Sequence, residues 1–266
     1  MYSAVEEFVR YQIANAPINP YPFPHFYVRP VFPEDYYREL LAHLPCTEVL
    51  KPIHEYGTSG KLDKQSGKLL ESEARFIADL AMLEEDEEAR GAGNLWRDLS
   101  SWLLSDEFRD LLVQKFDAGV RTRFGQVARL VTDVDGRFVR DFTQYLIHPH
   151  TDQPRKLVSL LFYLPSDESL RHQGTAMFRP IDPKLRCPGD ARHAFELFKK
   201  VATMPFLPNA LFGFFKTDYS FHGVEEIKDE RIERNVLLYN IYVKKVVTAA
   251  KPAAATSRWS WPFKGA

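Results

Sequence analysis

The 266-residue sequence lacks three features that would place it in a specialised class of protein. It has only two cysteines, Cys46 and Cys187, which we expect to be free thiols. No apolar run is long enough to span a bilayer. Its 35 basic and 36 acidic residues leave a formal charge of −1, so no global field would draw it to nucleic acid or to anionic lipid.

The remaining composition is that of an ordinary globular chain. Hydrophobic residues make up 45% and charged residues 27% of the sequence, enough apolar material for a sizeable core. The start "MYSAVEEFVRYQIANAP" has acids where a secretory signal peptide has bases. We therefore expect a cytoplasmic protein, built as one structural domain of the size of a large β-sandwich or barrel with helical additions.

Residues 1–126 read as mostly helical. Apolar residues recur at helical spacing in "SAVEEFVRYQIAN", "PEDYYRELLAHL" and "LWRDLSSWLLSDEFRDLLVQKF". Pro33 stands at a helix-opening position, and Ser105 is a candidate N-cap between two helices. The stretch "HEYGTSGKLDKQSGK" shows neither the helical nor the strand period, so we expect a loop there.

Residues 127–247 read as strands. The Asp135-Gly136 dipeptide lies between two β-rich runs and predicts a tight hairpin turn. Further short runs follow with Pro and Gly between them and no helical pattern, which favours an antiparallel sandwich or barrel over a parallel sheet. These runs are "KLVSLLFYLP", "GTAMFRPI", "ELFKKVATMPF", "ALFGFFKT", "YSFHGVEEI" and "RNVLLYNIYV". Residues 248–266 form an alanine-rich and then aromatic-basic tail, expected to be a flexible terminus.

One short segment carries most of the chemistry-bearing residues. In "IHPHTD", His148, His150 and Asp152 would share one face of a strand if the strand continued that far. Two histidines and one carboxylate that leave open positions on a metal suit Fe(II), Zn or Mn. His222 supplies a distant histidine in the apolar-aromatic run "YSFHGV". His148 is a rival ligand to His150.

A basic residue opens the next strand. Arg234 begins "RNVLLYNIYV", where a buried guanidinium would need an anion to pair with. Arg231, in the charged turn "KDERIER", is the other candidate for this role. We favour Arg234 because it abuts the apolar run.

The order His-x-Asp, His and then a basic residue opening a strand resembles the Fe(II)/2-oxoglutarate-dependent dioxygenases, in their prolyl-hydroxylase-like branch. The resemblance covers residues 127–245 and implies an α+β protein with a mainly β core, a double-stranded β-helix (jelly roll) on which N-terminal helices pack. It implies that His150, Asp152 and His222 hold Fe(II). Arg234 would bind the far carboxylate of 2-oxoglutarate, with Tyr163 and Ser159 near it.

The implied reaction is O2-dependent hydroxylation of an unactivated C–H bond, with release of succinate and CO2. Asp152 favours hydroxylation, because related halogenases replace this carboxylate with a small residue. We expect a small-molecule substrate and neither nucleic acid nor a transmembrane segment. Three parts of the chain are candidates for substrate recognition: the loop from His54 to Lys64, the helical first half and the cationic insertion "RPIDPKLRCPGDARHAF". The insertion could equally be a solvated lid.

Three other interpretations stay open. A cupin-like metal or sugar-binding protein also uses His-x-His on a barrel. That class has a glutamate shortly after the second histidine, and "HPHTDQPRKLV" contains no glutamate. A non-enzymatic β-sandwich would carry these histidines incidentally. A nucleic-acid demethylase would share the iron site but should show a basic groove with interleaved aromatics. The sequence names neither the substrate nor the oligomeric state.

Overall fold

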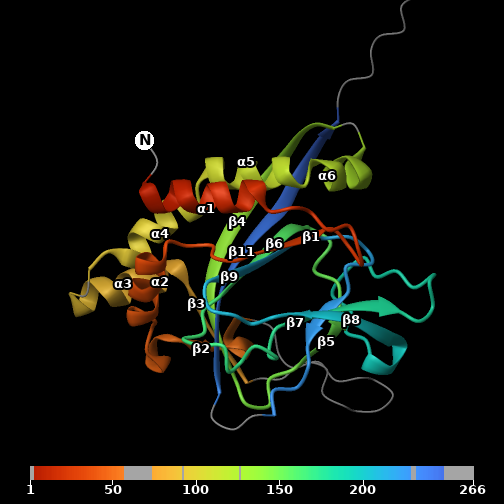
Figure 1. Cartoon of the computed structure of the whole chain (residues 1–266). Coiled ribbons are helices and arrows are strands. Elements are labelled where there is room, and N and C mark those ends of the chain that lie inside the picture. The colour runs from red at the N-terminus through yellow and green to blue at the C-terminus, as the bar shows by residue number, and fades with distance from the viewer. Residues whose placement is uncertain (1–2, 57–73, 92, 126, 229–231, 249–266) are drawn as a thin grey trace, which may run out of the picture.

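Two antiparallel sheets and a layer of helices make up the fold (Figure 1). The computed structural model describes residues 3–56, 74–91, 93–125, 127–228 and 232–248. The larger sheet has the order β1-β9-β6-β11-β4-β3-β2, and the smaller sheet has the order β5-β10-β7-β8. This architecture confirms the expected α+β class with a mainly β core and a jelly-roll arrangement of strands.

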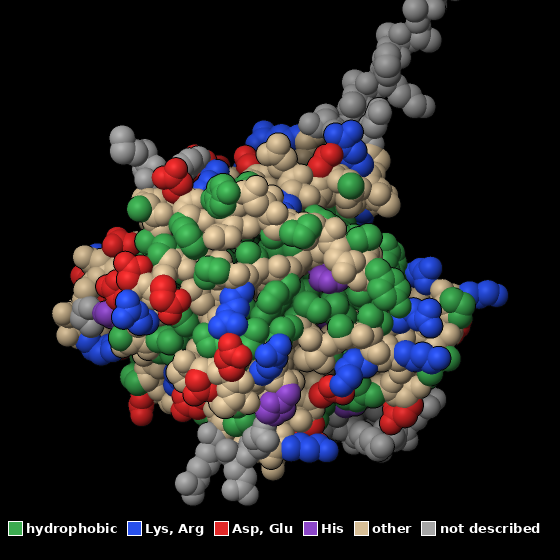
Figure 2. All heavy atoms as spheres, in the orientation of Figure 1, with side chains coloured by type: hydrophobic (Ala, Val, Ile, Leu, Met, Phe, Trp, Pro, Cys, Tyr) green, Lys and Arg blue, Asp and Glu red, His purple; other side chains and the backbone are tan. Residues whose placement is uncertain are grey.

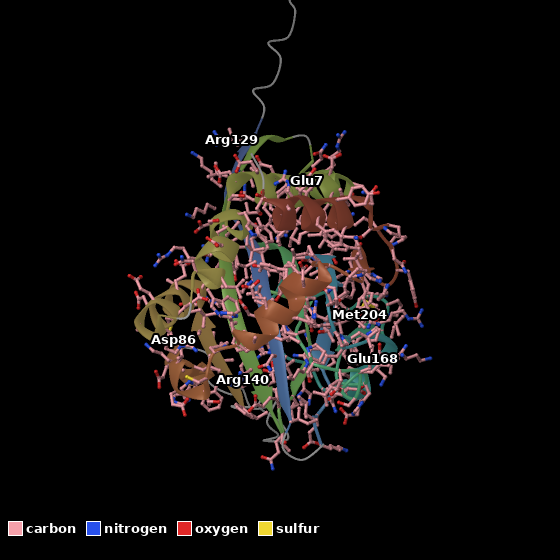
Figure 3. The ribbon with its side chains drawn as sticks, turned by 60° about the vertical axis from the view of Figure 1, so that its left-hand side comes forward. Glu7, Asp86, Arg129, Arg140, Glu168 and Met204 are labelled. Carbon is pink, nitrogen blue, oxygen red and sulfur yellow. The ribbon has the colours of Figure 1, made fainter. Side chains whose placement is uncertain are left out.

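The strands run as follows. In the larger sheet they are β1 (His25–Val28), β2 (Lys51–Pro52), β3 (Arg75–Asp79), β4 (Val127–Phe142), β6 (Lys156–Tyr163), β9 (Ala210–Phe215) and β11 (Glu233–Thr248). In the smaller sheet they are β5 (Ile147–His150), β7 (Thr175–Pro180), β8 (Phe198–Met204) and β10 (His222–Val224). The two longest strands, β4 and β11, pair along their whole length, and Figure 3 shows β4 running between Arg129 at one end and Arg140 at the other.

Strand alternation gives the larger sheet two different faces. Val236 belongs to the apolar cluster that also includes Met177 of the smaller sheet, whereas its neighbour Leu237 packs in the cluster formed with the helices. Phe162 and Tyr163 on β6 divide in the same way. Because successive side chains of a strand point to opposite faces, one face of the sheet meets the second sheet and the other meets the helices.

Six helices lie in the described part of the first 126 residues. They are α1 (Ala4–Asn15), α2 (Glu34–Ala42), α3 (Leu80–Arg90), α4 (Leu95–Leu103), α5 (Asp106–Lys115) and α6 (Asp117–Phe124). Pro33 directly precedes α2, as predicted. The Ser105 hydroxyl accepts a hydrogen bond from the Phe108 N–H and so caps α5, which confirms the predicted N-cap.

The predicted hairpin at Asp135-Gly136 is wrong. Both residues lie inside β4, where Asp135 pairs with Asn240 and Gly136 with Tyr239 of β11. A Cβ at residue 136 would lie 2.5 Å from a Leu80 methyl carbon of α3. Glycine is therefore required here for close helix-to-sheet packing and not for a turn.

The first region also contributes strands that the sequence analysis did not predict. β1 pairs with β9, and β3 pairs with β4, so both extend the larger sheet. The proposed division at residues 126 and 127 stays a prediction. The predicted tail lies outside the described residues, apart from its first residue, Thr248, which ends β11. No helix in the described part of the chain is long and apolar enough to cross a membrane.

We expect Gly213→Ala to destabilise the protein. Gly213 lies in β9 between β1 and β6, and a Cβ there would lie 2.5 Å from ring carbons of Phe26 and 2.7 Å from a Leu160 methyl carbon. Both neighbours are buried and have no room to withdraw. Overpacking of this kind lowers the free energy of unfolding by about 1–3 kcal/mol.

Urea denaturation measures the effect of this substitution. Val246→Ala, at an exposed position on β11, is the control and should change the free energy of unfolding by less than about 0.5 kcal/mol. Equal stability of Gly213→Ala and the wild type would show that the β1-β9-β6 packing is looser than described.

Candidate metal centre and adjoining cavity

Three side chains form a candidate metal centre in the smaller sheet. His150, Asp152 and His222 each offer one ligand atom, and these atoms lie within 4.8 Å of one another. The His222 Nε2 lies 4.0 Å from the nearer Asp152 carboxylate oxygen. The structure thus brings His150 and Asp152 close to His222, which follows His150 by 222 − 150 = 72 residues in the sequence.

Strand register explains why the two histidines meet. His222 on β10 is the antiparallel partner of His150 on β5, and directly paired residues hold their Cβ atoms about 4.5–5.5 Å apart on one face. The pairing is irregular just beyond His222. A Cβ at Gly223 would lie 2.4 Å from the Ile147 carbonyl oxygen, so this close pairing requires glycine.

Backbone hydrogen bonds orient both imidazole rings. The Nδ1 of His150 lies 3.0 Å from the His148 carbonyl oxygen, and the Nδ1 of His222 lies 3.0 Å from the Ser220 carbonyl oxygen. A carbonyl oxygen only accepts, so each Nδ1 carries the proton and donates it. Each Nε2 therefore keeps a lone pair, which is the arrangement that a metal-binding histidine needs.

The electrostatics of the group favour neutral imidazoles beside an ionised carboxylate. Burial lowers the pKa of His150 well below its ordinary value, and Arg192 and His222 act in the same direction. Burial also lowers the pKa of His222. Burial alone would raise the pKa of Asp152, but the Lys156 ammonium and the two histidines outweigh it and hold that pKa below its usual range. These are the protonation states that a metal ion requires of its ligands.

The sequence analysis missed Lys156 as a functional residue. Its ammonium lies 3.0 Å from one oxygen of Asp152, and the Ser159 hydroxyl donates to the other oxygen at 2.8 Å. Burial lowers the pKa of Lys156, but the attraction of Asp152 outweighs it and leaves that pKa raised. The only signal in the sequence was a lysine among the first residues of a buried strand.

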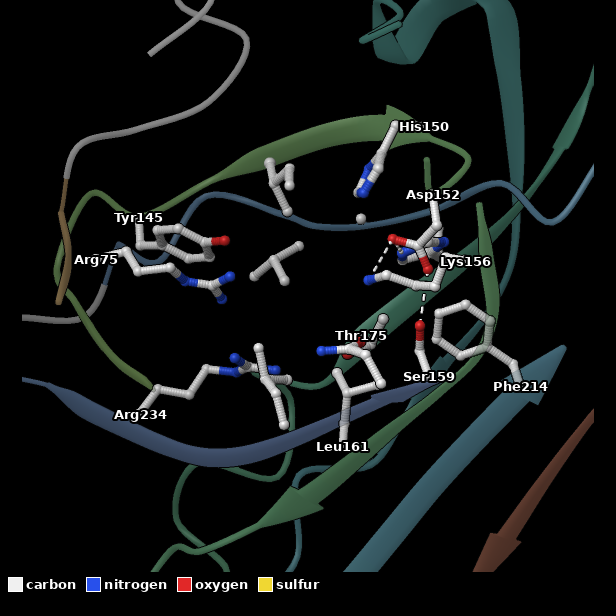
Figure 4. Close-up of a pocket in the computed structure, with 16 residues that line it drawn as sticks. Arg75, Tyr145, His150, Asp152, Lys156, Ser159, Leu161, Thr175, Phe214 and Arg234 are labelled. Carbon is white, nitrogen blue, oxygen red and sulfur yellow. Dashed lines mark hydrogen bonds and ion pairs between the residues drawn. The ribbon is translucent and has the colours of Figure 1, made fainter. Parts of the chain in front are cut away.

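A cavity extends from the metal group to a second cluster of charged residues. Figure 4 shows His150 and Asp152 at one end, Arg75, Tyr145 and Arg234 at the other, and Lys156 between them. Leu161, Thr175 and Phe214 also line the cavity. It can therefore hold an elongated ligand with one end at the metal group and the other at the arginines.

Arg234 lies in the cavity wall and is almost completely buried. Its Nε donates to the Gln173 carbonyl oxygen at 2.7 Å, and its Nη1 donates to Asp141 at 2.7 Å. The guanidinium carbon lies 4.9 Å from the centre of the Phe206 ring. The Nη2 is buried and has no hydrogen-bond partner among the described residues. Arg231, the other candidate anchor, lies outside the described residues.

Tyr163, Ser159 and His148 lie at different distances from the cavity. Tyr163 is fully buried behind it, and its hydroxyl donates to Thr175, which lines the cavity. Ser159 also lines the cavity, although its hydroxyl is bonded to Asp152. His148 packs against Phe195 with the rings tilted and their centroids 4.5 Å apart, and it is not part of the metal group.

The cationic insertion between β7 and β8 is attached to the metal-bearing segment. The Thr151 hydroxyl donates to the Cys187 carbonyl oxygen at 2.8 Å, and the His193 N–H donates to the Pro149 carbonyl oxygen at 3.0 Å. Arg192 forms an isolated bridge with His150. Lys and Arg side chains project from the side of the molecule where β7 and β8 lie (Figure 2). Of the expected loop from His54 to Lys64, residues beyond Tyr56 lie outside the described residues.

Of three comparisons with known proteins, only the one with solved structures found matches. No family model and no curated protein matches the sequence. Among solved structures, a prolyl 4-hydroxylase from Phytophthora capsici has a TM-score of 0.49 at 14% identity, covering 93% of this chain and 68% of that one. A 2OG-Fe(II) oxygenase-family oxidoreductase from Burkholderia pseudomallei has a TM-score of 0.46 at 12% identity, covering 94% and 96%. A Pseudomonas putida prolyl-4-hydroxylase has a TM-score of 0.44 at 15% identity, covering 89% and 98%.

We expect the protein to bind one divalent ion per chain at His150, Asp152 and His222. Calorimetric titration with Mn(II), or with Fe(II) under anaerobic conditions, measures this. His222→Ala should weaken binding by more than about 100-fold, since loss of a residue that merely supports a ligand already costs 10- to 100-fold. His148→Ala is the matched control and should bind like the wild type. Full binding by His222→Ala would rule out this centre.

We expect Lys156→Met to destabilise the metal-free protein by roughly 3–5 kcal/mol, because it leaves the buried Asp152 carboxylate without its cation. Added metal should stabilise this variant more than the wild type, because the ion replaces the missing positive charge. Thermal unfolding with and without Mn(II) measures both effects.

Lys244→Met removes an ion pair with Asp133 in which both side chains are more than half exposed, so it should change stability by less than about 1 kcal/mol. Equal metal responses of Lys156→Met and the wild type would mean that Lys156 and the ion do not share the Asp152 charge.

Proposed function

We propose that this protein is an Fe(II)- and 2-oxoglutarate-dependent oxygenase that hydroxylates a C–H bond of a small molecule. The observation that carries the proposal is a single cavity with a three-ligand metal group at one end and a buried arginine with an unpartnered N–H group at the other. A 2-oxo acid with a second carboxylate has matching groups at both of its ends.

The metal end fits iron by its donors. Two neutral imidazole nitrogens and one carboxylate on one side of an ion are a donor set that suits Fe(II) and leaves positions open. The backbone acceptors at His148 and Ser220 hold the imidazoles in place. Iron at this site, once loaded, would supply oxidation of a C–H bond by O2, coupled to conversion of 2-oxoglutarate to succinate and CO2.

The arginine end fits a carboxylate. A buried N–H group without a partner costs about 1–3 kcal/mol, and more where the group is charged. A carboxylate of the ligand would remove this cost at Arg234 through charge-assisted hydrogen bonds. Thr175 lines the same cavity and is held by Tyr163. Tyr163 would in this way support the ligand indirectly, and Ser159 would do so by orienting Asp152.

The protein's own residues orient the reactants. Arg234 and the metal ligands define the two ends of the co-substrate, and Leu161 and Phe214 provide apolar walls between them. Restricting water near the reacting atoms is the other task of the protein in such a reaction. The intact Asp152 supports hydroxylation as the outcome. The cytoplasmic location, the small-molecule partner and the helical region's part in substrate recognition belong to the same proposal.

We expect the chain, loaded with Fe(II), to form succinate from 2-oxoglutarate in an O2-dependent manner even before its substrate is known. Asp152→Ala should abolish this turnover, and His148→Ala should retain it. Mass spectrometry of succinate measures the product. Iron binding without succinate formation under any tested condition would favour the non-enzymatic alternative.

We expect Arg234→Met to remove the preference for a second carboxylate. Wild-type protein should bind 2-oxoglutarate more tightly than 2-oxopentanoate, which has a methyl group in place of the far carboxylate. Arg234→Met should weaken 2-oxoglutarate binding by roughly 30-fold or more, as expected for loss of one partner of a buried charge pair. Calorimetry on the anaerobic Fe(II) form measures both ligands. An unchanged preference would exclude Arg234 as the anchor.

A further inference from the structure

Three charged residues lie side by side across the larger sheet at the inner end of the cavity. Asp141 on β4 is the antiparallel partner of Arg75 on β3 and of Arg234 on β11. Side chains at directly paired positions are neighbours on one sheet face. The three strands therefore hold a positive, a negative and a positive group in a row, which we call the charge ladder.

The two arginines share the one carboxylate in different ways. Arg75 binds Asp141 through two parallel hydrogen bonds, from Nε at 2.6 Å and from Nη2 at 2.9 Å. Arg234 makes a single hydrogen bond to Asp141, to the same oxygen that the Arg75 Nη2 contacts. Asp141 is fully buried and Arg234 is 1% exposed. Asp141 is thus engaged more completely by Arg75 than by Arg234.

Because Asp141 is shared, the net charge near Arg234 depends on Arg75. A lone Asp141–Arg234 pair would be close to neutral, and a neutral pair attracts a carboxylate weakly. With Arg75 present, the ladder holds two guanidinium groups and one carboxylate, and both arginines line the cavity. The Arg234 Nη2 then remains as a charged donor that is not used by any residue in the part of the chain that the structure describes.

We propose that Arg75 is a positioning residue for the far carboxylate of the 2-oxo acid. It offsets the charge of Asp141, so that the group keeps a net positive charge and Arg234 is correctly oriented for that carboxylate. This inference rests on the proposed function and assigns a part of it to a residue of the first, mostly helical region. Arg75 acts through Asp141 and Arg234 and need not contact the ligand.

The test measures binding of 2-oxoglutarate and of 2-oxopentanoate to the full-length, anaerobic Fe(II) protein by calorimetry. Arg75→Gln should weaken 2-oxoglutarate binding by about 10- to 100-fold and change 2-oxopentanoate binding by less than about threefold. Arg75→Lys keeps the charge but loses the bidentate hydrogen bond. Its affinity for 2-oxoglutarate should lie between those of Arg75→Gln and the wild type.

A double variant separates this role from a structural one. In Arg75→Gln/Asp141→Asn, the aspartate that would neutralise Arg234 is gone, so 2-oxoglutarate affinity should recover most of the loss seen in Arg75→Gln. The control is Arg137→Gln. Arg137 pairs with Asp79 between the same two strands, β4 and β3, but at a position that does not line the cavity. This control should leave the binding of both ligands unchanged.

The outcomes distinguish the two proposals. If wild-type protein shows no preference for 2-oxoglutarate over 2-oxopentanoate, the proposed function fails and the role of Arg75 fails with it. If the wild type shows the preference and Arg75→Gln retains it, only the role of Arg75 is excluded. If Arg75→Gln loses affinity for both ligands equally, or the double variant shows no recovery, Arg75 supports the fold instead of the carboxylate site.

Discussion

The pairing of β5 with β10 is the constraint on which the candidate site depends. It places His150 opposite His222, and the turn that follows β5 brings Asp152 to the same point. A register shift of one residue would turn one imidazole to the other face of the sheet. The close approach of the two strands at Gly223 and the backbone acceptors of both Nδ1 atoms are specific to this register.

The buried charges at the two ends of the cavity have different ion-pair partners. At the metal end, Lys156 balances the Asp152 carboxylate. At the inner end, two arginines share the single carboxylate of Asp141. Burying a charge without a partner is expensive, so a cavity with an unpartnered donor on Arg234 is better explained by an anionic ligand than by fold stability alone.

Much of the fold and the metal centre could be predicted from the sequence, because both follow from local patterns. Apolar periodicity identified helices α1, α2, α4 and α5 and the strands from β6 onward. The hairpin predicted at Asp135-Gly136 was wrong, because the pairing of β4 with β11 and the packing against Leu80 override the turn propensity of this dipeptide. Arg75 was missed because its partner, Asp141, is identified only once β3 and β4 are paired. Lys156 was missed although its partner, Asp152, lies only four residues before it, across the connection between β5 and β6.

The charge ladder shows why the sequence alone does not identify Arg75 and Asp141 as site residues. Asp141 lies 66 residues after Arg75 and 93 residues before Arg234, and neither Arg75 nor Asp141 stands in a recognisable motif. Each alone has the appearance of a surface charge near a strand. Only the β3-β4-β11 order converts them into one buried group. Since β3 belongs to the first, mostly helical region, that region contributes Arg75 to the cavity wall as well as covering the sheet.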